Sequence, residues 1–141
     1  MLYVFNLLGY ILINVNFLRE ADMSAKSYSL RRSKTIHRDE EIRTFCDELA
    51  KRYRPLKITL FGSHASGMAR EDSDVDILVE MERFDSALGM AAAIVRETKP
   101  GFAVDILVRT PQQVKERISM GDPFIIEIIN SGKIVYETAD C

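Results

Sequence analysis

Residues 61–81 read FGSHASGMAREDSDVDILVEM, a segment in which glycine and aspartate interrupt two apolar runs. The pair Gly62 and Ser63 follows the apolar run 56–61, and Asp74 and Asp76 stand at the start of the next one. Aspartates on both sides of a buried valine place charge at the edge of a sheet, which is costly unless a cation neutralises it. The segment therefore predicts a strand, a turn and a second strand whose aspartates bind a cation.

The spacing of the aspartates favours magnesium. Asp74 and Asp76 are two residues apart, so on a strand both side chains leave the same face of the sheet, about 6–7 Å apart along it. This separation lets each carboxylate reach one of two Mg²⁺ ions about 4 Å apart. Asp105, in the run VDILV at 104–108, has the same position on another strand. If that strand lies beside 75–81, the three carboxylates form one cluster that can promote a displacement at phosphorus, with one carboxylate accepting a proton.

The glycine and serine of the turn can supply phosphate contacts. Gly62 at the end of a strand permits close approach of the backbone to a ligand, and the Ser63 hydroxyl can bind a β- or γ-phosphate with the N–H groups of the turn. Each feature alone has an ordinary explanation: a simple turn, solvated strand ends or helix caps, and a salt-bridge partner for Asp105. In combination they favour a site for a nucleoside triphosphate.

Three motifs carry a resemblance to a known family. LFGS at 60–63, SDVDILV at 73–79 and VDILV at 104–108 resemble the polymerase β type nucleotidyltransferase superfamily. The run DPFIIEIINSGKIVYE at 122–137 resembles its minimal members, which are paired with HEPN proteins in prokaryotic toxin–antitoxin modules. The resemblance covers about 39–137 and implies an α/β (α+β) fold, a small mixed sheet with helices packed on it.

The resemblance assigns roles by position. Asp74 and Asp76 resemble the two Mg²⁺ ligands, and Asp105 resembles the third metal-binding or base carboxylate. Gly62 and Ser63 resemble the contact with the triphosphate of ATP. All five residues are therefore candidate site residues.

The turn departs from the family pattern at one point. Many minimal members carry a basic residue in the turn, where this sequence has His64 and Ser66. Arg70, in the following loop, is the candidate that supplies the missing charge to the phosphates. His64 itself is interpreted as a polar residue of the turn, because a neutral imidazole offers little to a triphosphate.

The activity implied by the resemblance is Mg²⁺-dependent transfer of AMP from ATP to a hydroxyl. For the minimal members that hydroxyl belongs to a tyrosine of the partner HEPN toxin, which the modification silences. Two alternatives stay open: an antitoxin that acts by binding alone, and an adenylyltransferase for a small molecule of the aminoglycoside type. The intact acidic cluster argues against a pure binding protein, because charge repulsion brings such a protein no benefit.

Composition excludes several other classes. The chain has 141 residues, 19 of them basic and 21 acidic, and its net charge of −2 gives no field that favours nucleic acid or an anionic membrane. Its two cysteines and two histidines form neither a CxxC motif nor a cluster, so zinc and a disulfide framework are not expected. Reduced thiols in a cytoplasmic protein are the simplest interpretation.

We expect residues 1–38 to lie outside the folded domain at 39–137. The apolar segment 2–18 is near the lower length limit for a membrane span but contains three asparagines, so a membrane anchor is one alternative. The other, which we favour, is that translation starts at Met23 and that everything before it is an extension without a role. The basic run 24–38 has no apolar period and predicts a linker or loose arm.

Periodicity and caps predict the elements of the domain. Helices are expected at 39–53, 63–68 (a short one), 86–97, from Thr110 and from Asp122 to Gly132, and strands at 56–61, 75–81, 102–108 and 133–137.

Overall fold

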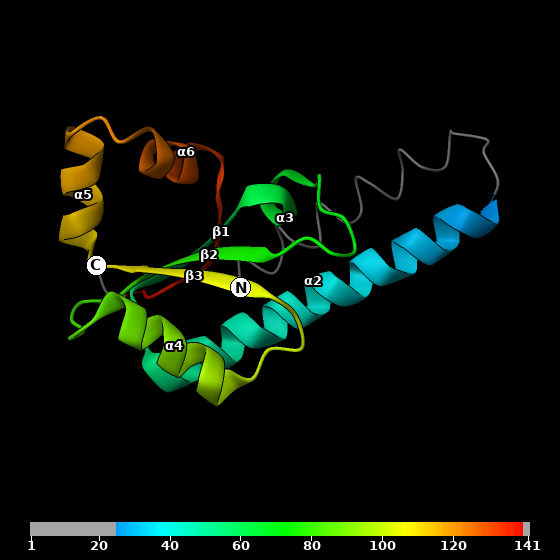
Figure 1. The fold of residues 1–141 in the computed structure, drawn as a ribbon, viewed down its shortest axis with the longest axis horizontal. Helices are drawn as coiled ribbons and strands as arrows, with labels where there is room; N and C mark the ends of the chain where they lie inside the picture. Colours follow the sequence, from blue (N-terminus) through cyan, green and yellow to red (C-terminus); the bar gives the residue numbers. More distant parts are fainter. Residues whose placement is uncertain (1–24, 140–141) are drawn as a thin grey trace.

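The fold is built on one mixed sheet of four strands. The computed structural model describes residues 25–139, with side chains from residue 38 onward (Figure 1). The strands are β1 (Lys57–Phe61), β2 (Val75–Glu80), β3 (Val104–Arg109) and β4 (Lys133–Glu137), in the spatial order β3-β2-β1-β4. β1 runs antiparallel to both β2 and β4, whereas β2 and β3 are parallel. The predicted α/β fold with a small mixed sheet is confirmed.

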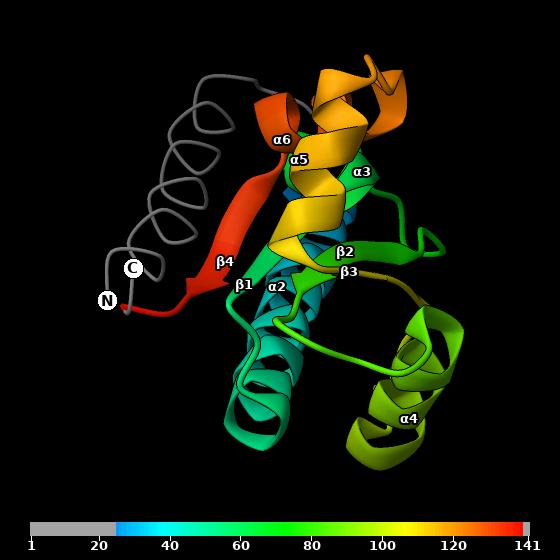
Figure 2. The same cartoon turned by 90° about the vertical axis from the view of Figure 1, so that its left-hand side faces the viewer.

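Helices cover both faces of this sheet. They are α2 (Ala25–Tyr53), α3 (Gly62–Ser66), α4 (Ala87–Thr98), α5 (Pro111–Ser119) and α6 (Pro123–Ser131). Helices α2 and α4 lie on one face, and α5 and α6 lie on the other (Figures 1 and 2). The two sides of β2 therefore point into separate apolar cores.

Alternation along β2 assigns its side chains to these two cores. Val75, Ile77 and Val79 are fully buried on one face, as their shared parity predicts. They belong to a cluster with Leu49 of α2 and Ile94 of α4. Leu78 faces the opposite side, where it packs with side chains of α5 and α6: Val114, Ile125 and Ile128. The aspartate at position 76 has the parity of Leu78, so it faces the side of α5 and α6.

The helices α5 and α6 begin where their sequence signals predict. The Thr110 hydroxyl accepts a hydrogen bond from the backbone N–H of Gln113, whose side chain accepts one from the backbone of Thr110 in return. The Asp122 carboxylate caps α6 by accepting from the N–H groups of Phe124 and Ile125. Each cap is followed by a proline, which suits the first position of a helix. These caps set the start of the two helices that stand over the aspartate side of the sheet.

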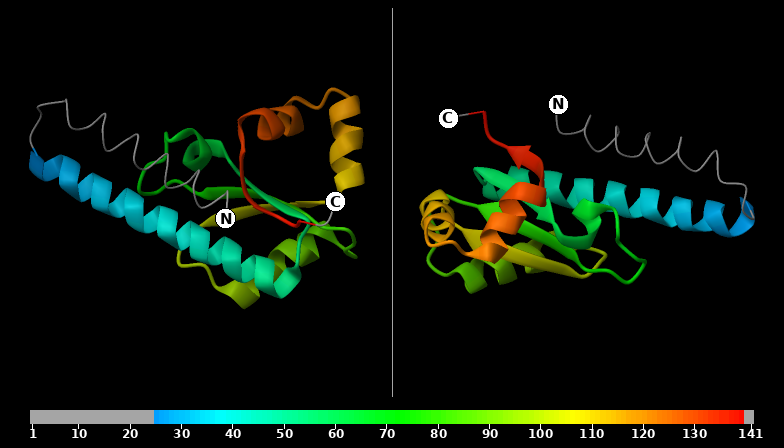
Figure 3. Two further views of the ribbon diagram at one scale, coloured as in Figure 1. Left: turned by 180° about the vertical axis from the view of Figure 1, so that it is seen from behind. Right: turned by 90° about the horizontal axis from the view of Figure 1, so that it is seen from above.

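The expected loose arm is wrong for residues 25–38, because α2 begins at Ala25. The segment 25–53 contains neither glycine nor proline. Once the C-terminal part of α2 is packed through its apolar face at 42–49, each further turn extends a helix that is already nucleated. Helix α2 consequently projects beyond the sheet at its N-terminal end (Figure 3).

Within residues 25–139, no helix combines the length and the apolar character that crossing a bilayer requires. The two interpretations of the segment 1–22 concern residues outside the described part of the chain.

The parallel pair β2 and β3 repeats one pentapeptide. Both strands contain Val-Asp-Ile-Leu-Val, and the two copies pair residue for residue from Val75 opposite Val104 to Val79 opposite Val108. Parallel neighbours need a crossover connection, which α4 provides. The register places Asp76 opposite Asp105.

Candidate active site

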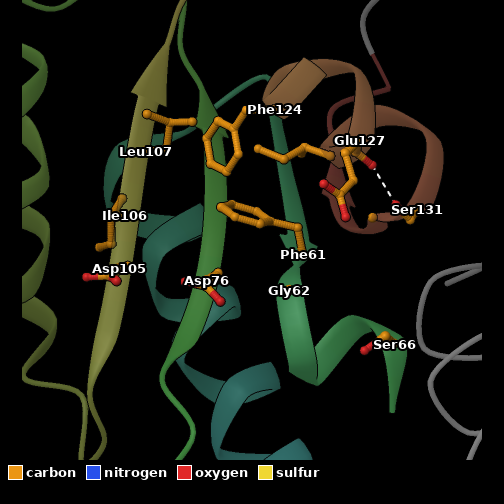
Figure 4. A pocket seen from close by; sticks show the side chains of 12 residues that line it. Phe61, Gly62, Ser66, Asp76, Asp105, Ile106, Leu107, Phe124, Glu127 and Ser131 are labelled. Carbon is orange, nitrogen blue, oxygen red and sulfur yellow. Dashed lines mark hydrogen bonds between the residues drawn. The ribbon is translucent and has the colours of Figure 1, made fainter. Parts of the chain in front are cut away.

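Two of the three predicted aspartates lie side by side. Asp76 and Asp105 are register partners on adjacent parallel strands, and both line one cavity (Figure 4). Asp76 is half-buried and Asp105 is exposed. Asp74 precedes the first residue of β2 and is exposed, so it flanks the pair without forming part of the cavity wall. The condition on which the cluster depended, that β3 is the neighbour of β2, is met.

The carboxylates repel one another. Burial, and then the charges of Asp105 and Asp74, raise the pKa of Asp76 above its usual value, while His64 acts in the opposite direction. Among the side chains described from residue 38 to residue 139, no lysine or arginine forms a salt bridge with any of the three aspartates. The site therefore has a surplus of negative charge that a bound cation would offset.

Gly62 makes room for the carboxylate of Asp76. Its backbone has φ +70°, a conformation that L side chains rarely adopt. A methyl group at this position would collide with Oδ2 of Asp76 and would come within 3.2 Å of its Cγ. Packing within the protein therefore requires glycine at position 62, because a side chain at the end of β1 would occupy the space of the Asp76 carboxylate on β2.

The cavity has a volume of about 660 Å³ and extends from the aspartates to helix α6. Gly62, Asp76 and Asp105 lie at one end, and residues of β1, β3, α6 and the C-cap of α6 form the rest of the wall: Phe61, Ile106, Leu107, Phe124, Glu127, Ile128, Ser131 and Gly132. Ser66 of α3 also reaches the wall. A volume of this size is typical of a site for a small molecule such as a nucleotide.

The contribution of α6 was missed by the sequence interpretation. Its wall residues are Phe124, Glu127, Ile128 and Ser131, which follow one another at spacings of three, one and three. This spacing places all four on one face of a helix. The signal in the sequence that could have revealed this face is the presence of the polar residues Glu127 and Ser131 in a largely apolar helix. Glu127 adds a third carboxylate to the cavity, and its side chain points toward Phe61 (Figure 4).

Two predicted phosphate contacts do not form part of the cavity wall. Ser63 follows Gly62 in α3 and is half-buried. Arg70 is exposed, and its backbone closes a turn with Ser73: its N–H donates to the Ser73 hydroxyl at 2.8 Å, and its carbonyl accepts from the Ser73 N–H at 3.1 Å. Because neither Ser63 nor Arg70 lines the cavity, their assigned contacts with the triphosphate stay predictions.

His64 connects the glycine turn to the aspartate loop. Its Nε2 lies 3.2 Å from the backbone carbonyl oxygen of Ser73. A carbonyl oxygen only accepts, so this hydrogen bond requires the proton on Nε2. The residue after Ser73 is Asp74, and His64 therefore fixes the entry to β2 relative to α3.

The donor set fits Mg²⁺ held together with a phosphate. Among residues described by the structure, no three or more His, Cys, Asp or Glu side chains form a group that could hold a metal ion. Mg²⁺ is usually bound by one or two carboxylates together with the phosphates of its substrate, and it prefers oxygen ligands. The paired carboxylates of Asp76 and Asp105 fit that mode of binding, which needs no complete protein cage.

Paired strand-end carboxylates beside a glycine turn, at one end of a cavity of nucleotide size, are typical of enzymes that act on phosphate groups. Residues 40–136 match the family model of the nucleotidyltransferase domain. The chain belongs to this family, and it is a nucleotidyltransferase.

Named relatives share part or all of this domain. The chain is 27% identical over 104 residues to "Putative protein adenylyltransferase MJ0604" of Methanocaldococcus jannaschii. The matched region covers 72% of this chain and 100% of the relative. It is 51% identical over 41 residues to protein adenylyltransferase MntA of Thermococcus cleftensis, a match to 29% of this chain and 41% of that protein.

A solved structure titled "Crystal structure of the toxin-antitoxin with AMP-PNP" is similar over 69% of this chain and 74% of its own, with 19% identity and a TM-score of 0.45. A TM-score of this size is too low to bear on fold or function.

Proposed function

We propose that this nucleotidyltransferase transfers AMP from ATP, with Mg²⁺, to a tyrosine hydroxyl of a partner HEPN toxin. The observation that carries the proposal is the in-register pair Asp76 and Asp105 at one end of a nucleotide-sized cavity. The names of the two relatives, both protein adenylyltransferases, support AMP as the transferred group. The resemblance of the C-terminal segment to minimal toxin-paired members supports the choice of acceptor.

Asp74, Asp76 and Asp105 are the residues that would hold Mg²⁺. When bound, Mg²⁺ supplies stabilisation of the negative charge on the attacking and leaving oxygens. Gly62 and Ser63 contact the triphosphate.

Asp105 accepts the proton of the acceptor hydroxyl while that oxygen bonds to the α-phosphorus of ATP. The bond from this phosphorus to the adjacent bridging oxygen breaks, and pyrophosphate leaves. Because Asp105 is exposed, a hydroxyl presented by another protein can reach it.

Intact-protein mass spectrometry tests this function. The full chain is incubated with ATP, Mg²⁺ and the protein encoded by the adjacent gene, and the expected result is a gain of one or more AMP groups on that protein. Replacement of the acceptor tyrosine by phenylalanine, and removal of Mg²⁺ with a chelator, should each abolish the gain. Neutralisation of the toxin without any mass change, by the wild type and by Asp76→Asn alike, would identify an antitoxin that acts by binding alone.

The bond from His64 to Ser73 predicts a moderate effect on turnover. His64→Ala should lower kcat about fivefold, the amount that one neutral hydrogen bond contributes, because the entry to β2 is then less well fixed. His64→Gln should restore part of the rate, since an amide N–H can donate to the same carbonyl. Steady-state kinetics with separate kcat and KM for ATP measure both variants. Equal rates for all three proteins would show that this bond does not position the aspartates.

A further inference from the structure

Charge is distributed unevenly along the chain. Residues 25–37, which we call the basic segment of α2, form the N-terminal part of that helix. The segment contains no acidic residue and four basic ones: Lys26, Arg31, Arg32 and Lys34. All 21 acidic residues of the chain lie outside it, so the rest of the chain is net negative. One molecule therefore carries opposite potentials on two of its parts.

The basic segment projects from the end of the sheet that carries the aspartates. Arg38, the residue that follows the segment, lies over the ring of Phe102 at 5.2 Å from the centroid. Phe102 comes just before β3, whose second residue is Asp105. Strands β2 and β3 both start at the end of the sheet toward which α2 extends (Figure 1). Because an α-helix rises about 1.5 Å per residue, the segment reaches about 20 Å beyond Arg38.

We infer that the basic segment of α2 binds an acidic surface of the acceptor protein and so presents that protein to the aspartates. This inference rests on the proposed function for the identity of the acceptor. The acceptor hydroxyl has to approach Asp105, which is exposed in a part of the chain that is net negative. Positive charge at the edge of the site offsets the repulsion of an acidic acceptor and steers its association.

An RNA strand fits the same segment less well. Nucleic acid is bound through phosphate contacts along a basic surface. Here the basic run ends at Arg38 and is followed at once by three acidic residues, 39–41. Beyond them the carboxylates of Asp76 and Asp105 would repel a phosphate backbone that continued toward the site. An acidic patch of limited size on a protein matches the extent of the positive charge.

Removal of this charge from the full-length protein tests the inference. The variant combines four changes: Lys26→Gln, Arg31→Gln, Arg32→Gln and Lys34→Gln. Glutamine has a helix propensity close to that of lysine and arginine, so α2 should keep its extent. With the protein encoded by the adjacent gene as acceptor, kcat/KM for the acceptor should fall about tenfold, at the lower end of the range for electrostatic steering. The kcat at saturating acceptor and the KM for ATP should stay unchanged.

The matched control removes the same charge from exposed positions toward the other end of the sheet. It combines four changes: Lys51→Gln, Arg52→Gln, Arg83→Gln and Lys115→Gln. Its kcat/KM for the acceptor should equal that of the wild type. Isothermal titration of the acceptor without ATP or Mg²⁺ separates binding from chemistry, and the Kd should rise about tenfold in the segment variant alone.

Four results have distinct meanings. Unchanged kcat/KM and Kd in the segment variant, or an equal loss in the control, would overturn the inference. Binding of poly(U) RNA that depends on the segment, with acceptor binding that does not, would make the segment an RNA-binding surface and the inference wrong. Acceptor binding that depends on the segment, without any AMP transfer, would support the docking surface and overturn the proposed function instead.

Discussion

Asp76→Asn is expected to lower the rate of AMP transfer by about 10²- to 10⁴-fold, the range for loss of a group that acts directly on the reacting atoms. Asp76 is the half-buried member of the carboxylate pair and is fixed by its register with Asp105. An amide keeps the size of the side chain but removes the charge that would hold Mg²⁺. The rate is measured as AMP incorporated into the acceptor at saturating ATP.

The same variant should be more stable than the wild type at neutral pH. Burial and the charges of Asp105 and Asp74 raise the pKa of Asp76, so the folded state binds more protons than the unfolded chain. The ionised carboxylate therefore destabilises the fold above its folded-state pKa, and this loss disappears as the pH falls below the usual value of 3.8. Thermal unfolding should show a higher Tm for Asp76→Asn at pH 7 and no gain at pH 3.

Asp72→Asn is the matched control, because Asp72 is an exposed aspartate of the preceding loop. It should retain activity and Tm. An active Asp76→Asn protein with Mg²⁺ present, or a loss of equal size in Asp72→Asn, would contradict the assignment of the carboxylate pair.

Gly62→Ala is expected to reduce AMP transfer about 10²-fold, although the new side chain is only a methyl group. That methyl would collide with Oδ2 of Asp76, and the carboxylate must move away to admit it. Displacement of a reacting group by about 1 Å is enough for a loss of this size. The positive φ of 70° adds about 1–2 kcal/mol of destabilisation for an L-residue.

Gly121→Ala separates the two effects. Gly121 has φ +75°, but a methyl group there would meet no atom within 4 Å. The backbone cost is therefore similar, while Asp76 is untouched. Urea unfolding should show comparable losses of stability in both variants, and only Gly62→Ala should lose activity. If Gly121→Ala lost as much activity as Gly62→Ala, general destabilisation and not the collision would explain the effect.

Helix starts are the part of this fold that local sequence predicts best. Thr110 and Asp122 each precede a proline, and both caps form as expected, since their hydrogen bonds involve only near neighbours in sequence. The sequence interpretation began this helix at residue 39, because it gave weight to the polar composition of 25–38 and not to the absence of any helix-breaking residue there.

The sequence motifs named three of the residues that line the cavity, Gly62, Asp76 and Asp105, but not their arrangement. The motif identified Asp76 and Asp105, yet whether they meet depends on which strand lies beside β2, and a crossover through α4 decides that. The motifs gave no sign of the aromatic part of the cavity wall, Phe61 and Phe124. Phe124 lines the cavity because α6 packs over the end of β1, where its ring contacts the ring of Phe61.

The repeated pentapeptide of β2 and β3 has a consequence for refolding. Because β2 and β3 carry the same pentapeptide, its side chains do not distinguish the pairing of β2 with β3 from a pairing of either strand with a copy of the pentapeptide in another molecule. Only the tether through α4, which keeps β3 at high local concentration, favours the intramolecular partner. β3 lies at one edge of the sheet, and in concentrated solution we expect its exchange between chains to give domain-swapped dimers with native registry.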